Sequence, residues 1–199
     1  MYNSDWNRSG IVKKYEDSWS IVELLSHSRH DWMNKLQLLK GNLALKKYER
    51  AKEIIDEIVM EAQHESKLCN LHMKRFAEYI LTHNWRNPVF PVEFVVLGEA
   101  MRLTNLDDQI TNWTEAFFNR IEKAVEPNHE HEMIITIETD RKEDIRFVFQ
   151  FHGILHDRGE LLSFLNEKTN MPLNVHVIKN ESSEITVHVT INLDEVCIQ

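Results

Sequence analysis

The residues best suited to chemistry lie in one short run, Ser26–Asn42, which reads SHSRHDWMNKLQLLKGN. A neutral imidazole such as that of His30 has a free lone pair near pH 7 and can attack an aspartyl phosphate without a separate general base. The phosphoramidate formed keeps a high transfer potential, so a second aspartate can take the phosphoryl group from it. Positioning and charge neutralisation are the remaining requirements, and Arg29 and Lys35 are the nearest cations. Phosphoryl transfer through a histidine is therefore one chemistry that this run could carry.

A helix through this run would point His30 into solvent. At about 100° per residue, His30 falls opposite an apolar stripe whose members recur at spacings of three, four and seven. The stripe consists of Val22, Leu25, Trp32, Leu36, Leu39 and Leu43. Arg29 fills the missing step of the stripe and could equally be structural. The face of His30 also carries Asn34, Gln37, Gly41 and, at its edge, the apolar Leu38. Such a shallow, uncharged surface suits a docked partner, although an exposed histidine is more often an ordinary surface residue.

Two amphipathic helices are predicted for this part of the chain, at about Asp17 to Leu45 and Tyr48 to Leu68. The apolar face of the second helix consists of Ala51, Ile54, Ile55, Ile58, Val59 and Ala62. Because the connection is so short, the two helices must be antiparallel. A lone hairpin cannot bury both of its apolar faces, so we expect a second copy to complete a homodimeric four-helix bundle. A monomer in which the rest of the chain covers the hairpin is the alternative.

The chain after Asn70 mixes helical and strand-like patterns. Helices are predicted near 71–85, 107–126 and 157–170. Strands are predicted near 90–98, 133–139, 145–152, 174–179 and 184–193. The expected fold class is α+β, in which a helical hairpin precedes an α/β sandwich with helices on one face of a largely antiparallel sheet. The expected domains are a flexible lead-in at 1–16, the hairpin at 17–70 and the sandwich at 71–199.

Composition excludes several classes of function. The formal net charge of −9 argues against binding to nucleic acid, because such binding needs Lys and Arg to neutralise phosphates. The 5 glycines form neither GxGxxG nor a P-loop, so there is no Gly-rich cradle for a nucleotide. No apolar run approaches the ~18 residues of a membrane span and no secretory signal begins the chain, so we expect a cytoplasmic protein without membrane contact. Cys69 and Cys197 have no spacing that indicates a disulfide or a zinc site.

Two polar clusters have simpler interpretations than catalysis. The run His129–Glu132 lacks a known metal-ligand spacing and is interpreted as an exposed turn between a helix and a strand. Asp107 and Asp108 are expected at a helix N-terminus, where negative charge is favoured.

Ser26–Asn42 continues through LALKKYERAKEIIDEIV to HESKLCNL at His64–Leu71, and this region resembles the sporulation initiation phosphotransferase B family of endospore-forming bacteria. The hairpin of that family carries an RHDWMNKLQL phosphoacceptor segment. The resemblance is specific over about Leu24 to Leu71 and follows element order over the remainder. It implies that His30 is phosphorylated and that the chain forms a homodimer through a four-helix bundle.

The resemblance also implies partners and roles. A single-domain response regulator, regulator F, would donate its phosphoryl group to His30, and the receiver of a transcription factor, regulator A, would accept it. The residues that would dock both receivers are Asn34, Gln37, Leu38 and Gly41. Arg29, Asp31, Asn34 and Lys35 would support the histidine. The chain would hold no cofactor of its own, because Mg²⁺ would belong to the acidic pocket of the receiver.

The hairpin also resembles the dimerisation and phosphoacceptor domain of sensor histidine kinases, whose H-[ED]-x-x-N run is matched by His30, Asp31 and Asn34. That resemblance implies an ATP-binding domain after Asn70. However, Lys123 stands where the magnesium-binding asparagine is expected, and no DxGxG loop occurs. We therefore expect a degenerate kinase-ATPase-like domain that does not bind ATP. An ATP-dependent histidine kinase and a non-catalytic module that binds receivers remain the alternatives.

Overall fold

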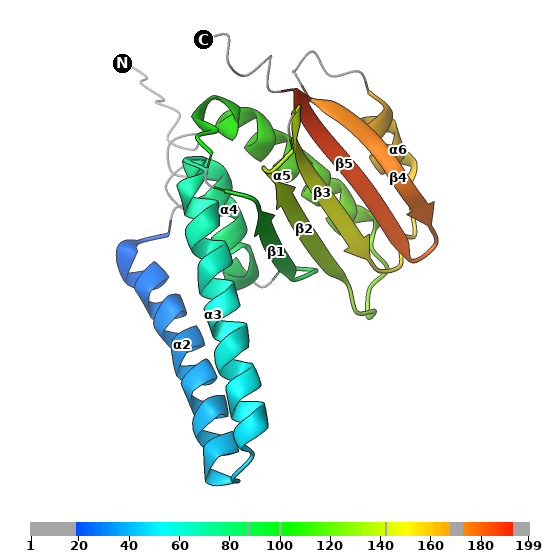
Figure 1. The fold of residues 1–199 in the computed structure, drawn as a ribbon. Coiled ribbons are helices and arrows are strands. Elements are labelled where there is room, and N and C mark those ends of the chain that lie inside the picture. The colour runs from blue at the N-terminus through cyan, green and yellow to red at the C-terminus, as the bar shows by residue number, and fades with distance from the viewer. Residues whose placement is uncertain (1–18, 87, 100, 142, 168–172, 193–199) are drawn as a thin grey trace, which may run out of the picture. The chain divides into compact units, whose positions relative to one another are not determined.

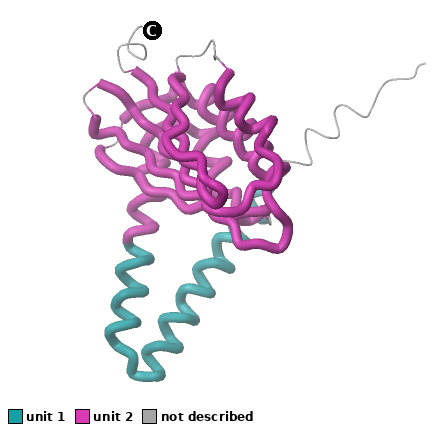
Figure 2. Tube along the Cα trace, turned by 90° about the vertical axis from the view of Figure 1, so that its right-hand side faces the viewer, with its two compact units in different colours: residues 1–59 teal, residues 60–199 magenta. Residues whose placement is uncertain are grey.

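The computed structural model describes residues 19–86, 88–99, 101–141, 143–167 and 173–192 (Figure 1). The lead-in predicted at 1–16 and the helix start predicted at Asp17 lie outside the described residues. The chain separates into two compact units, Met1–Val59 and Met60–Gln199, which Figure 2 colours separately.

Helices α2 and α3 are the two helices of the predicted hairpin. Helix α2 spans Ile21–Ala44, and helix α3 spans Tyr48–Asn70, so that α3 continues into the second unit. Helix α2 begins with a capping box in which the Ser20 hydroxyl accepts from the backbone N–H of Glu23 while the Glu23 carboxylate accepts from the backbone N–H of Ser20. The turn between the helices has Lys46 in the left-handed region, with φ of 56°. Among the described helices, none has the length and apolar character that crossing a membrane requires.

The second unit contains a five-stranded sheet with the order β1-β2-β3-β5-β4. The strands are β1 Val92–Leu97, β2 Glu132–Glu138, β3 Asp144–His152, β4 Asn174–Glu181 and β5 Glu184–Asn192. Strands β1 and β2 pair in parallel, and the other described pairs are antiparallel. Helices α4 (Lys74–His83), α5 (Asp107–Ala124) and α6 (Gly159–Asn166) lie on one face of the sheet (Figure 1). The predicted α+β class is confirmed.

Aromatic side chains fill the core between these helices and the sheet. On α5, Trp113 and Phe117 lie one turn apart and both rings contact Phe149 of β3, with centroid distances of 5.2 and 5.7 Å. The imidazole of His83 is enclosed in the same core and donates from Nε2 to the Phe90 carbonyl at 3.1 Å. Burial lowers the pKa of His83, so its ring stays neutral and is compatible with an apolar core.

The C-terminal part of α3 is fixed within the second unit. Leu68 and Leu71 are both fully buried in its core. His64 Nδ1 accepts from the Val96 N–H at 3.2 Å, and Lys67 Nζ donates to the Val96 carbonyl at 3.3 Å. These side chains satisfy both backbone groups of a residue on β1, the edge strand, and so protect that edge from pairing with another chain.

The paired acids Asp107 and Asp108 lie at the start of α5, as predicted, but Asp107 caps a different helix. Its carboxylate accepts from the backbone N–H groups of Arg75 and Phe76 at 3.0 and 2.9 Å, which are otherwise unsatisfied donors at the start of α4. Asp108 instead pairs with the Arg75 guanidinium at 2.6 Å. The two acids therefore hold α4 and α5 together.

The prediction of an exposed turn at His129–Glu132 is wrong for His131. His131 is only 8% exposed, because its Nε2 donates to the Glu126 carbonyl at 2.8 Å and its ring stacks on Phe151. The neighbouring His129 and Glu130 are exposed as predicted.

We expect Asp107→Ala to destabilise the second unit by about 1–2 kcal/mol, because two N–H groups at the start of α4 lose their acceptor. Denaturant unfolding followed by circular dichroism measures this change. Asp108→Ala is the matched control: its side chain is 76% exposed and makes a surface ion pair, so the loss should stay below about 1 kcal/mol. Equal losses for the two variants would contradict the capping role of Asp107.

Candidate functional site

Helix α2 lies open to solvent along its length. None of its residues is buried by any described part of the chain. Its predicted apolar stripe is uncovered too: Val22 is 77% exposed, and Trp32 and Leu36 are each 50% exposed. The apolar face of the second helix is partly buried: Ala51 and Ile54 are each 2% exposed, whereas Ile55 and Val59 are about half exposed. The hairpin therefore presents an apolar surface that the described chain does not cover.

His30 lies on the part of α2 away from this stripe, and its side chain is 71% exposed. Its Nδ1 is 3.3 Å from Oδ1 of Asp31 and 3.3 Å from Nδ2 of Asn34. A neutral imidazole cannot use Nδ1 for both contacts, because donation to Asp31 requires a proton there and acceptance from Asn34 requires a lone pair. The two contacts correspond to the two tautomers of the ring.

The tautomer decides which nitrogen can act as a nucleophile. With the proton on Nδ1 and directed at Asp31, Nε2 carries the lone pair. Among the described residues, none makes a hydrogen bond to Nε2, so this atom is open to a partner. With the proton on Nε2, Asn34 would donate to Nδ1 and the outward nitrogen could not attack. Asp31 therefore favours the Nδ1–H tautomer, in which Nε2 keeps its lone pair, and Asn34 favours the Nε2–H tautomer.

The other predicted site residues surround His30 on the same helix. Arg29 is exposed and directs its guanidinium to the Ser26 hydroxyl at 3.4 Å. Lys35 places its ammonium 5.9 Å from the centre of the Trp32 ring.

Leu38 is 54% exposed, and a Cβ added at Gly41 would meet no atom within 4 Å. Asn34 and Gln37 are exposed beside them. The predicted docking residues therefore form one accessible surface with the histidine.

The sequence also contained a signal for the N-terminus of α2 that the prediction missed. The spacing of Ser20 and Glu23 is that of a capping box, and it would have placed the helix start at Ile21. Hydrogen bonds from the Ser20 hydroxyl and the Ser20 backbone amide lower the pKa of Glu23. The carboxylate therefore stays charged at the positive end of the helix dipole, two to three turns before His30.

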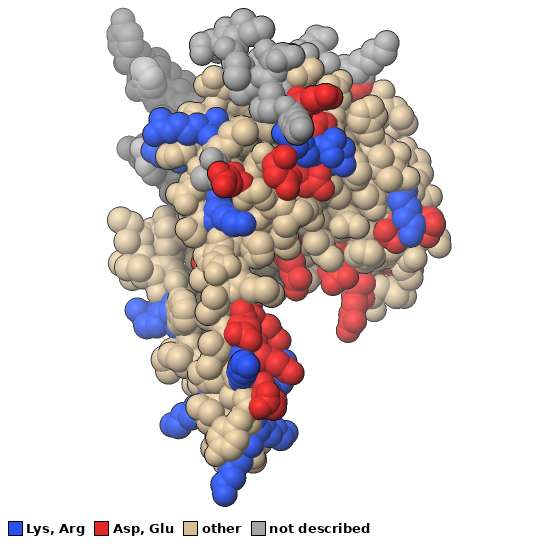
Figure 3. Space-filling view, in the orientation of Figure 1, with Lys and Arg blue, Asp and Glu red and all other residues tan. Residues whose placement is uncertain are grey.

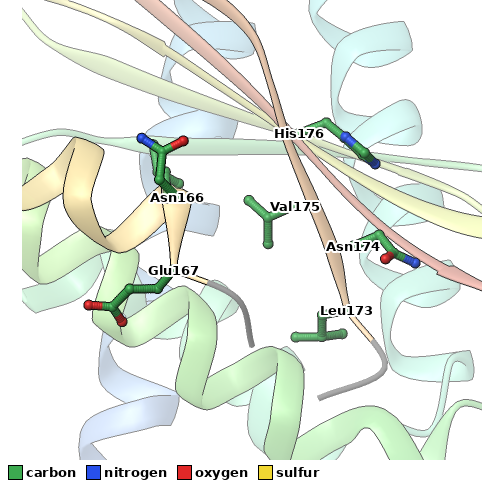
Figure 4. A pocket seen from close by; sticks show the side chains of 7 residues that line it. Asn166, Glu167, Leu173, Asn174, Val175 and His176 are labelled. Atoms are coloured by element: carbon green, nitrogen blue, oxygen red, sulfur yellow. The ribbon is translucent and has the colours of Figure 1, made fainter. Parts of the chain in front are cut away.

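The second unit has a pocket of about 360 Å³ between the end of α6 and the start of β4 (Figure 4). Its apolar lining is Leu165, Leu173 and Val175, and its polar lining residues include Asn166, Glu167 and Asn174. None of the predicted site residues lies in this pocket. Within the described ranges, no three His, Cys, Asp or Glu side chains are grouped as a metal site would require. The predicted site residues all lie on α2.

Comparison with known proteins relates both parts of the chain to one family. Residues 72–192 match the family model described as sporulation initiation phospho-transferase B, C-terminal. Residues 12–71 match the model described as sensor kinase SpoOB-type, alpha-helical domain. The chain is 36% identical over 175 residues to sporulation initiation phosphotransferase B of Bacillus subtilis (strain 168), across 87% of this chain and 90% of the relative.

Solved structures with a detectable likeness include histidine kinases. The catalytic domain of histidine kinase ThkA aligns with 62% of this chain and 91% of its own, at 14% identity and a TM-score of 0.44. ThkA in complex with the response regulator protein TrrA aligns over 94% of this chain and 68% of its own, at 14% identity and a TM-score of 0.40. A blue-light activated histidine kinase of Erythrobacter litoralis EL346 aligns over 90% of this chain and 62% of its own, at 11% identity and a TM-score of 0.41.

Proposed function

Because the chain belongs to the sporulation initiation phosphotransferase B family, we propose that it transfers phosphoryl groups in a sporulation phosphorelay through a phosphohistidine at His30. The donor is the aspartyl phosphate of a single-domain response regulator, regulator F, and the acceptor is the receiver aspartate of a transcription-factor response regulator, regulator A. The observation that carries the proposal is the exposed imidazole of His30, which has Nδ1 in contact with Asp31 and Nε2 open to solvent.

Both steps of the reaction balance without a further reactant. In the first step, the Nε2 lone pair attacks phosphorus, the bond from phosphorus to the donor carboxylate breaks, and that carboxylate leaves with the electron pair. The phosphorylated ring is cationic while Nδ1 keeps its proton, and Asp31 stabilises this charge through the same contact. In the second step, the acceptor carboxylate attacks phosphorus, and the N–P bond breaks to restore the lone pair of Nε2.

The supporting residues act by position and charge. Arg29 and Lys35 place cationic groups on the flanks of the histidine, where they can offset phosphoryl charge as a receiver approaches. Between Leu24 and Ala44 the sequence has a single carboxylate, Asp31. Mg²⁺ prefers several oxygen ligands, so we assign the ion to the carboxylates of the receiver and give this chain no cofactor.

A homodimer is part of the proposal. The uncovered apolar stripe of α2 and the half-exposed Ile55 and Val59 of α3 are complementary to a second hairpin, which would complete a four-helix bundle. His30 lies away from the stripe, so dimerisation leaves Asn34, Gln37, Leu38 and Gly41 available to dock a receiver. Partner binding and self-association would then use opposite faces of one helix.

Transfer of label tests the central assignment. A single-domain response regulator phosphorylated with ³²P on its aspartate, mixed with the protein and Mg²⁺ but no ATP, should label the wild type with acid-labile, base-stable phosphate. His30→Gln should take no label and keep its fold, because the side chain is exposed, and His27→Gln on the same helix should label normally. Label that appears only with ATP would favour the kinase alternative, and receiver binding without label would favour the non-catalytic module.

Asp31→Asn should slow single-turnover transfer by about tenfold to a hundredfold, because the amide neither favours the Nδ1–H tautomer as strongly nor neutralises the phosphorylated ring. Rapid-quench measurement at saturating receiver separates this effect from docking. Glu23→Gln is the matched control, since its carboxylate lies on the same helix but contacts Ser20. An unchanged rate for Asp31→Asn would remove Asp31 from the mechanism.

Leu36→Glu should convert the dimer to a monomer, because it would bury a charge in the centre of the proposed bundle. Sedimentation velocity measures the mass directly. Leu38→Glu adds the same charge at a site of similar exposure, 54% against 50%, on the face of His30, and it should remain a dimer. A monomeric wild type, or a dimer that survives Leu36→Glu, would contradict the arrangement.

A further inference from the structure

The turn end of the hairpin carries an excess of positive charge in an acidic protein. Residues 32–48 contain four lysines and no carboxylate, although the whole chain has a formal charge of −9. The negative charge lies in the second part of the chain. Residues 60–199 have 13 Lys and Arg and 23 Asp and Glu, whereas residues 1–59 have 10 Lys and Arg and 9 Asp and Glu. The formal charges of the two parts are therefore −10 and +1. The positive run is local, and the proposed chemistry does not account for it.

Three of these lysines have free ammonium groups. Lys40, Lys46 and Lys47 are exposed, and no hydrogen bond or ion pair links their side chains to any described residue. Figure 3 shows basic side chains gathered at the closed end of the hairpin. Arg50, at the start of α3, differs because it pairs with Glu53 and Glu57 at 2.9 and 3.0 Å. Lys40, Lys46 and Lys47 are hereafter called the lysine tip.

The lysine tip is within reach of a protein docked on His30. Lys40 follows His30 by ten residues, which is about 15 Å along the helix at ~1.5 Å per residue. A standard interface buries about 800 Å² per partner, equivalent to a disc with a radius of about 16 Å. At about 100° per residue, Lys40 also lies about 80° around the helix from His30, on the side of the apolar stripe. Lys40 is thus at the margin of an interface centred on His30, beside the docking face and not on it. Lys46 and Lys47 lie beyond that margin, where charges act over a Debye length of about 8–10 Å to guide the approach of a partner.

The backbone of the lysine tip has an unusual conformation at Lys46. Lys46 occupies the left-handed region with φ of 56°, a conformation that costs an L-residue energy and that glycine adopts freely. The turn therefore keeps a cationic side chain where the backbone alone would favour glycine. A purely structural role is that lysines at the end of α2 interact with the helix dipole, and this role predicts an effect on stability only.

We propose that the lysine tip is an electrostatic docking surface for the acidic face of a receiver domain. The partner is identified by its chemistry: a receiver that phosphorylates an aspartate with Mg²⁺ must gather carboxylates around that site. Such a face is attracted to the lysine tip and repelled by the surplus of carboxylates in residues 60–199. The lysine tip increases the rate of productive encounter and leaves the chemical step to His30. This inference rests on the proposed function, because it takes His30 as the centre of docking.

The test compares charge at the tip with the same charge elsewhere. The triple variant Lys40→Gln, Lys46→Gln, Lys47→Gln should reduce kcat/KM for transfer from a phosphorylated single-domain receiver about tenfold at ~20 mM salt. Its kcat at saturating receiver should stay within about twofold of wild type, and the difference in kcat/KM should disappear by ~0.5 M salt. The matched control is Lys74→Gln, Arg102→Gln, Lys123→Gln, which removes three exposed cations from residues 60–199 and should leave kcat/KM within about twofold.

Receiver affinity, measured by titration calorimetry on the same proteins, separates the two proposals. Weaker, less salt-dependent binding by the triple variant supports the lysine tip. If wild type shows lysine-dependent binding but never takes label, the proposed function falls and the docking surface stands. If wild type transfers phosphate and the triple variant matches it at low salt, or the control loses as much, the docking surface is overturned alone. A triple variant that loses activity only in proportion to a lower unfolding midpoint would overturn it in favour of the dipole role.

Discussion

A helix of 24 residues that buries none of its side chains within its own described chain is the constraint on which this molecule depends. Isolated helices gain little stability from propensity alone, and in proteins most of it comes from packing an amphipathic face. Helix α2 has such a face, with Val22, Leu25, Trp32 and Leu36 at least half exposed. A stripe of this size in water favours association. The requirement that the stripe be covered fixes which side of the helix remains available, and His30 lies on that side.

Helix α3 belongs to both compact units. Helix α3 continues past the first unit and places Leu68 and Leu71 in the core of the second. His64 and Lys67 then occupy the N–H and carbonyl of Val96 on the edge strand. The N-terminal part of α3 therefore belongs to the hairpin, and its C-terminal part packs in the core of the second unit.

Sequence reasoning was most successful where the determining contacts are local. The periodicity of apolar residues located each described α-helix and strand to within a few residues, although it did not indicate the short 3-10 helix Thr104–Leu106. The i, i+4 spacing of His30 and Asn34 implied neighbouring side chains. Apart from the local capping box of Ser20 and Glu23, the features that the sequence did not predict are contacts between distant parts of the chain. Asp107 accepts from backbone groups 31 and 32 residues earlier. His131 is buried because Phe151, twenty residues later, lies against its ring. The parallel pairing of β1 with β2 likewise joins segments about forty residues apart, and no local pattern specifies it.

The neighbours of the His30 side chain follow from the sequence, but the position of the ring proton does not. The sequence supplies a histidine, an aspartate and an asparagine, and a helix places them together, yet the distribution of one proton decides whether the outward nitrogen is a nucleophile. The two contacts at 3.3 Å give the ring two alternatives of similar geometry. An approaching phosphoryl group changes their balance, because positive charge on the ring strengthens the contact with Asp31 and removes the lone pair that Asn34 needs. In the proposed transfer, the Nδ1–H tautomer would therefore be selected as the phosphoryl group approaches, and His30 need not favour that tautomer strongly in the free protein.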